Sequence, residues 1–165
     1  ELHQGHIDII LMALPYPSEK TEQLILWSEP FYVARAAGPN NKKLPPLSTE
    51  QLKQENVLLL DDGHCLRDHI MAACRIVPDT DSGKKNLGAT SLQTLLQMVQ
   101  HGYGITLIPS MAAHHENLGI GLITQSFSKP IPTRQIGLVW RKNDARAKEF
   151  FLLGDFIKSY QPQNP

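Results

Sequence analysis

Short, nearly continuous apolar runs that alternate with helix-like stretches constrain this sequence more than any other feature. HIDIILMA (6–13), NVLLLDD (56–62) and GITLIPS (104–110) have strand length, as strands covered on both faces do. TSLQTLLQMVQHG (90–102) and ARAKEFFLLGDFIKSY (145–160) have the apolar spacing of amphipathic helices. We therefore predict an α/β fold with a mainly parallel sheet.

Length and charge limit the kinds of partner that this chain can bind by itself. Its 165 residues suffice for one domain or for two small lobes. Its 16 basic and 16 acidic residues balance without a basic cluster, which argues against a grip on nucleic acid. It has no apolar run of the roughly 18 residues that span a bilayer. The opening sequence has neither Met nor a signal-peptide pattern, and we expect a fragment whose upstream part is missing.

The two cysteines lie on one predicted helix. The apolar positions that define it are Leu66, Ile70, Ala73 and Val77. Their spacing predicts a helix over about 64–77, ended by Pro78. Cys65 falls in its first turn, and Cys74 falls at the edge of the apolar stripe, where we expect it to be buried.

The spacing of the cysteines has a geometric consequence. Nine residues at about 100° each turn the helix by about 900°, so the two thiols point to opposite sides, roughly 13–14 Å apart along the axis. A disulfide requires Cα atoms within about 7 Å of each other. An intact helix and a Cys65–Cys74 disulfide therefore exclude each other, and a chain with one structure for each redox state has the bistable element that a switch requires.

Cys65 also has the surroundings of a reactive thiol. A helix N-terminus favours the thiolate, and His64 and Arg67 can add positive charge or hydrogen bonds. A thiolate attacks peroxide to give a sulfenic acid, with which Cys74 can condense. These residues leave open two inert thiols, a permanent disulfide, and a metal site that includes His69. The metal spacing matches no usual zinc pattern, and we expect neither a metal nor a cofactor.

The stretch DDGHCLRDHIMAAC carries a resemblance to a known family. The GHCLRD motif (63–68) and the second cysteine, Cys74, resemble the peroxide-sensing LysR-type transcriptional regulators. ATSLQTLLQMVQHGYGITLIPSMA (89–112) and IGLVWRKN (136–143) are similar to LysR-type effector domains in general.

The resemblance implies a periplasmic-binding-protein-like effector domain. Such a domain has two Rossmann-like lobes joined by crossover strands. Residues 1–30 and 134–160 would belong to lobe I, whose first portion is missing, and residues 34–130 would form lobe II with the cysteines. The winged helix-turn-helix that binds DNA in this family is absent from this chain.

The resemblance also implies roles for particular residues. Cys65 would be the peroxidatic thiol and Cys74 the resolving thiol. The residues that would line or order the peroxide pocket are Gly63, His64, Leu66 and Arg67. Oxidation would refold the 64–77 region and switch the transcription of antioxidant genes, which is the work of a stoichiometric sensor and not of an enzyme.

The partners implied in this way are those of a cytoplasmic transcription factor. They are hydrogen peroxide, further copies of the protein in a homodimer or tetramer, DNA through the missing N-terminal domain, RNA polymerase, and thiol reductants of the glutaredoxin or thioredoxin type. No membrane is expected.

Two other functions remain open at this point. The chain could be a metabolite-binding LysR-type effector domain with incidental cysteines. Its effector crevice would then lie near Thr90 and Ser91, at a strand-to-helix junction, although both residues are first of all candidate helix caps. It could also be a periplasmic solute-binding lobe with a structural disulfide, but the unbroken helical pattern between Cys65 and Cys74 argues against a permanent bond.

Overall fold

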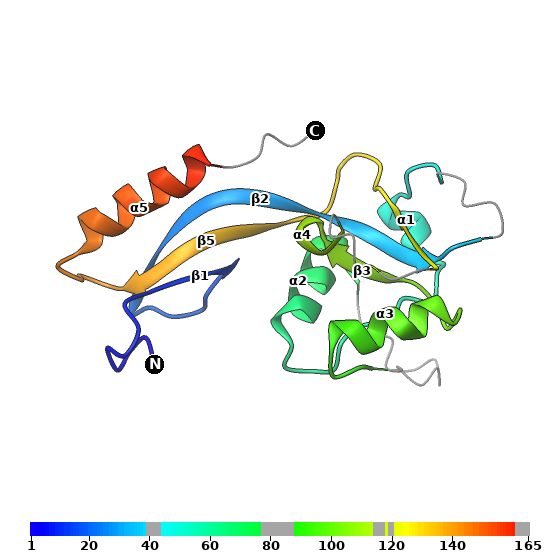
Figure 1. Ribbon diagram of the computed structural model, residues 1–165, viewed down its shortest axis with the longest axis horizontal. Helices are drawn as coiled ribbons and strands as arrows, with labels where there is room; N and C mark the ends of the chain where they lie inside the picture. Colours follow the sequence, from blue (N-terminus) through cyan, green and yellow to red (C-terminus); the bar gives the residue numbers. More distant parts are fainter. Residues whose placement is uncertain (39–43, 77–87, 114–117, 119–120, 161–165) are drawn as a thin grey trace. The chain divides into compact units, whose positions relative to one another are not determined.

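The chain forms two compact units, and the backbone crosses from one unit to the other twice. The computed structural model describes residues 1–38, 44–76, 88–113, 118 and 121–160 (Figure 1). One unit consists of Glu1–Glu29 with Arg134–Pro165, and the other is Pro30–Thr133. None of the helices in the described part of the chain is long and apolar enough to span a bilayer.

The first unit is built on three strands and one helix. Its strands are β1 (Ile9–Leu14), the first part of β2 (Thr21–Ala36) and β5 (Thr133–Arg141). β1 pairs antiparallel with β5, from Ile9 opposite Trp140 to Leu14 opposite Gln135, and β5 lies between β1 and β2 in the sheet.

Helix α5 (Ala147–Ser159) covers a face of this unit's strands, as Figure 1 shows in orange and red. Phe150 packs against Leu26, Leu138 and Trp140 in a buried cluster. A Cβ at Gly154 would collide with the side chain of Leu24. The glycine that weakens the helical pattern of the sequence therefore permits the close approach of α5 to β2.

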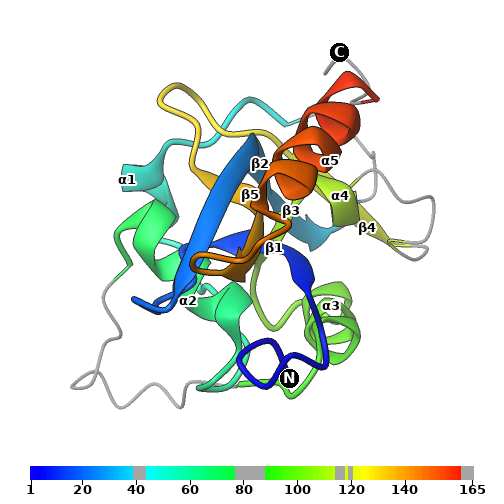
Figure 2. The ribbon, with the colours of Figure 1, turned by 90° about the vertical axis from the view of Figure 1, so that its left-hand side faces the viewer.

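The second unit contains the second part of β2 and two further strands, β3 (Thr106–Pro109) and β4 (Leu122–Gln125). Val33 of β2 pairs with Leu107 of β3 and with Gln125 of β4, so β2 is the central strand here. The helices of the unit are α1 (Thr49–Leu52), α2 (Cys65–Cys74), α3 (Leu92–Gln100) and α4 (Ser110–Ala113). Figure 2 shows α1, α2 and α3 of this unit in cyan to green.

The α/β class is confirmed, but the expected mainly parallel sheet is wrong for the described ladders, which are all antiparallel. Parallel pairing in the described part of the chain is confined to isolated bridges. They join Leu47 to Phe127, Val57 to Ile105, and Leu60 to Ala89. Segment 56–62 thus makes two single pairs in place of the predicted strand. The expectation failed because burial on both faces does not fix strand direction: β5 is buried from Ile136 to Trp140 and is antiparallel.

Two local features of the sequence bear on these elements. Pro30 lies inside β2, and the strand runs through it without interruption. It is tolerated because it comes just before Phe31, where the ladder with β3 begins. At α1, Ser48 and Gln51 form the reciprocal capping box of a helix N-terminus.

Candidate functional site

A tight turn leads the chain into the cysteine helix. The His64 N–H donates to the carbonyl oxygen of Asp61 at 3.4 Å. Gly63, the third residue of this turn, has a φ of +90°, a backbone conformation that residues other than glycine rarely adopt. The Asp61 N–H donates to the Ala89 carbonyl oxygen at 3.1 Å, which fixes the start of the turn to a neighbouring segment. The glycine of the GHCLRD motif is therefore required by the backbone.

Helix α2 starts with the reactive-thiol candidate. His64 is the N-cap with extended backbone, and its side chain makes no capping hydrogen bond. Its carbonyl oxygen accepts the Arg67 N–H at 2.9 Å. Cys65 is the first helical residue and is exposed. The thiol thus lies in the first turn, where a small oxidant in solution can reach it.

The Arg67 side chain binds the segment that precedes α2. Its Nη1 donates to the carbonyl oxygen of Leu60 at 2.9 Å, and its Nε lies 3.0 Å from Oδ1 of Asp62. The guanidinium-bearing side chain is 13% exposed and the Asp62 side chain 93%. Because one partner is a carbonyl and the other a solvated carboxylate, the bond to Leu60 is the one that holds the first turn of α2 in place.

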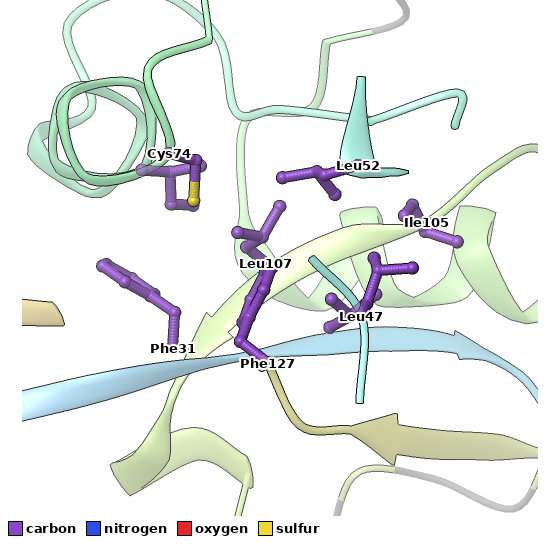
Figure 3. Close-up of a cluster of buried hydrophobic side chains, with 9 residues drawn as sticks. Phe31, Leu47, Leu52, Cys74, Ile105, Leu107 and Phe127 are labelled. Atoms are coloured by element: carbon purple, nitrogen blue, oxygen red, sulfur yellow. The ribbon is translucent and has the colours of Figure 1, made fainter. Parts of the chain in front are cut away.

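Cys74 lies at the opposite end of the helix in a different environment. It is 1% exposed, and Figure 3 shows its sulfur directed into the cluster that includes Phe31 and Leu107. The cluster consists of Phe31, Leu47, Leu52, Ile70, Cys74, Ile105, Leu107 and Phe127, with Val33. Burial raises the pKa of the Cys74 thiol to about 12. In this position it is a neutral, weakly nucleophilic group.

The helix runs without interruption from one thiol to the other, and both thiols are free. This is the reduced arrangement that the spacing predicts, and the buried Cys74 and exposed Cys65 agree with the predicted stripe. Leu66 packs against two buried clusters of the unit, one of which also contains Ile70.

The end of α2 differs from the prediction. The helix stops at Cys74 because Arg75 has the left-handed conformation, with φ 52° and ψ 42°. The predicted end near residue 77 is therefore wrong, and Val77 itself lies outside the described residues. Glycine and asparagine are the usual signals of such an ending. Neither is present at this position, so no residue type in the sequence indicated that the helix would end there.

The alternative crevice residues, Thr90 and Ser91, are both exposed. The Ser91 hydroxyl accepts the Thr94 N–H at 3.1 Å and caps α3. Of the two candidate caps, Ser91 is therefore the N-cap. The Ser91 hydroxyl oxygen is thus engaged in the cap of α3. Within the described residues, no three His, Cys, Asp or Glu side chains gather in a way that could hold a metal ion.

The fold and this site define a class of protein. Residues 1–161 match the LysR substrate binding domain, and the chain belongs to that family. Within it, the chain is similar to OxyR proteins. It is 35% identical over 162 residues to the DNA-binding transcriptional dual regulator OxyR of Escherichia coli K12, covering 96% of this chain and 52% of that protein.

Solved structures give the same result. An H2O2-bound cysteine-to-serine mutant of Corynebacterium glutamicum OxyR is 35% identical, with a TM-score of 0.83 over 96% of this chain and 50% of that one. The reduced OxyR regulatory domain of Pseudomonas aeruginosa is 31% identical, with a TM-score of 0.74 over 96% of this chain and 76% of that one. The periplasmic-binding-protein-like fold expected for a LysR-type domain is thereby confirmed. The chain spans about half the length of the curated relatives that it matches.

Proposed function

We propose that this chain is the hydrogen peroxide-sensing part of a LysR-type transcriptional regulator. The observation that carries the proposal is the pair of unlike thiols on α2: Cys65 is exposed at the helix start and Cys74 is buried at its end. Support comes from the relatives, which are named as OxyR or as activators of peroxide-inducible genes. One solved relative, the cysteine-to-serine mutant of Corynebacterium glutamicum OxyR, is bound to H2O2.

The first chemical step takes place at Cys65. Its thiolate sulfur attacks one oxygen of hydrogen peroxide, the O–O bond breaks, and a hydroxide leaves and takes up a proton to become water. The sulfur is oxidised by two electrons to a sulfenic acid, and the peroxide is reduced. The exposure of Cys65 and its place in the first turn of α2 suit this step.

The second step cannot proceed in the reduced fold. With a pKa of about 12, the buried Cys74 thiol is ionised to roughly one part in 10⁵ at neutral pH. The rise along an intact α2 also keeps the two sulfurs apart. The helix therefore opens, Cys74 leaves the core and ionises, and its sulfur attacks Cys65. The S–S bond forms as the sulfenic oxygen leaves as water, so one peroxide and two thiols give one disulfide and two waters.

The residues around Cys65 have different parts in this scheme. Gly63 makes the turn that presents the thiol, and His64 lies beside it as the N-cap. Leu66 fastens the first turn to the core. Arg67 orders the pocket by binding Leu60 and Asp62. We assign these four residues to the peroxide pocket, with Arg67 acting by holding the backbone in place.

The output would be a change in transcription. Refolding of the 64–77 region would alter the assembly of the full-length protein, a homodimer or tetramer, and through it the contacts of the N-terminal winged helix-turn-helix with DNA and the recruitment of RNA polymerase. Glutaredoxin- or thioredoxin-type reductants of the cytoplasm would restore the dithiol. The protein would act as a stoichiometric activator of antioxidant genes, away from any membrane.

The test is oxidation of the reduced protein with one equivalent of hydrogen peroxide, followed by intact mass and far-UV circular dichroism. The parent is expected to lose about two mass units, as an intramolecular disulfide does, together with helical signal. Cys74→Ser should retain a sulfenic acid that reacts with dimedone, and Cys65→Ser should stay reduced.

Other outcomes would contradict the proposal. Reaction of Cys65→Ser at the parent rate would show that Cys65 is not the peroxidatic thiol. A disulfide that forms with no loss of helical signal would contradict the opening of α2. Melting shifts with small metabolites that are the same in the parent and in a variant lacking both cysteines would instead indicate a metabolite-binding effector domain.

A further inference from the structure

Helix α2 ends on a residue in an unfavourable conformation. Arg75, directly after Cys74, has φ 52° and ψ 42°. Its N–H donates to the carbonyl oxygen of Met71, and so does the N–H of Ile76, at 3.0 Å. The Arg75 bond is the last α-helical bond, whereas the Ile76 bond spans one residue more and goes with the left-handed backbone at Arg75.

The left-handed conformation is energetically unfavourable for arginine. Its Cβ crowds the following carbonyl group, whereas glycine has no Cβ, and asparagine and aspartate can form local hydrogen bonds. Asn143 is the other non-glycine residue with positive φ among the described residues, and it is of the tolerant type. The strain at Arg75 favours opening of the last turn by about fivefold over the same backbone with glycine.

We propose that the backbone strain at Arg75 raises the equilibrium constant for Cys65–Cys74 disulfide formation and so sets how oxidising the surroundings must be to open α2. This inference rests on the proposed peroxide-sensing function. Burial of Ile70 and Cys74 holds the C-terminal half of α2 closed, and the strain one residue beyond Cys74 opposes it. Opening the last turn relieves the strain and releases the resolving thiol together, so the strain shifts the equilibrium toward the disulfide.

The mechanism predicts that the Cβ of Arg75 matters and that its charge does not. Arg75→Gly removes the strain, and Arg75→Ala removes the charged side chain but keeps the Cβ. Asn143→Gly is a matched control, because it relaxes a left-handed residue in the unit that does not contain α2. All three changes lie outside the residues assigned to the peroxide pocket.

The first experiment equilibrates each protein in glutathione buffers. There, two glutathione thiols reduce the protein disulfide and become glutathione disulfide, and mass spectrometry counts the oxidised fraction. We expect Arg75→Gly to lower the equilibrium constant for disulfide formation about fivefold. Arg75→Ala and Asn143→Gly should stay within about twofold of the parent. Equal constants for the parent and Arg75→Gly, or equal shifts for the glycine and alanine variants, would overturn the proposal.

A second measurement does not depend on the redox chemistry. Amide hydrogen exchange in the reduced proteins should slow about fivefold over the last turn of α2 in Arg75→Gly and remain unchanged in Arg75→Ala. Unchanged exchange in Arg75→Gly would show that strain at Arg75 does not promote opening of the last turn. If the parent forms no disulfide with peroxide, the proposed function is refuted. If exchange is nevertheless slower in Arg75→Gly, the strain at Arg75 is a property of the helix without a redox role.

Discussion

At the scale of single residues, the burial of Cys74 makes stability depend on alkaline pH. Its pKa is raised in the folded protein from an ordinary value of 9.0 to about 12. Above pH of about 9 the unfolded chain loses the Cys74 proton and the folded chain keeps it. The free energy of unfolding is thus unaffected by this group below that pH and falls by up to about 1.4 kcal/mol per pH unit between about 9 and 12.

The measurement is denaturant unfolding of the reduced protein at a series of alkaline pH values. Lysines and tyrosines also titrate there, so the difference between the parent and Cys74→Ala isolates the buried thiol. We expect the parent to lose stability more steeply than Cys74→Ala above pH of about 9. Cys65→Ala, which removes the exposed thiol, should follow the parent. Parallel pH profiles for the parent and Cys74→Ala would contradict the high pKa.

Residues differ in how far the sequence alone predicts their state. The burial of Cys74 and the exposure of Cys65 follow from a single apolar stripe, because helical periodicity fixes which side chains share a face. The partners of Arg67 do not follow from it. The carbonyl of Leu60 comes from another segment, and only the turn at Gly63 brings the two together. The Arg67 guanidinium is thus hydrogen-bonded to the segment that precedes α2.

At the scale of the element, α2 is anchored at its start and strained at its end. The sequence predicted the start near residue 64 from the apolar stripe that begins at Leu66, and the helix begins at Cys65. The sequence does not predict the end, because the helix stops at Arg75 in a left-handed conformation that this residue type disfavours. In the same way, apolar runs located β3 and β5 but did not give the direction of pairing, which the chain connections decide.

The anchor can be tested by shortening the Arg67 side chain. Arg67→Gln loses the hydrogen bond to the Leu60 carbonyl, which is then left without this charged donor. We expect a loss of about 1–2 kcal/mol in the free energy of unfolding and faster amide exchange in the first turn of α2. Hydrogen-exchange mass spectrometry and urea unfolding measure the two effects.

The control for the anchor is Asp62→Asn. It removes the ion pair but retains the bond to Leu60, and Asp62 is 93% exposed. Exposed ion pairs contribute little, so this variant should unfold almost as the parent does. An equal loss of stability in the two variants would show that the ion pair, and not the carbonyl bond, holds the start of the helix.

At the scale of the whole molecule, the two units have separate cores. Each of the four buried clusters in the described part of the chain takes its residues from a single unit. The chain passes between the units at Glu29–Pro30 and at Thr133–Arg134. A buried ion pair joins these two passages: Nε of Arg134 lies 2.8 Å from Oε2 of Glu29, whose side chain is 1% exposed.

Such a pair is costly to break, because a buried charge that loses its partner keeps its desolvation penalty. Glu29→Gln should therefore lower the free energy of unfolding by about 2 kcal/mol, measured by urea denaturation. Glu55→Gln is the matched control: Glu55 pairs with Arg35 at 2.7 Å but is 35% exposed, and solvent screening should make its loss much smaller. If the two variants lose equal stability, burial does not set the strength of these pairs. If Glu29→Gln is as stable as the parent, the two passages are held together by strand packing alone.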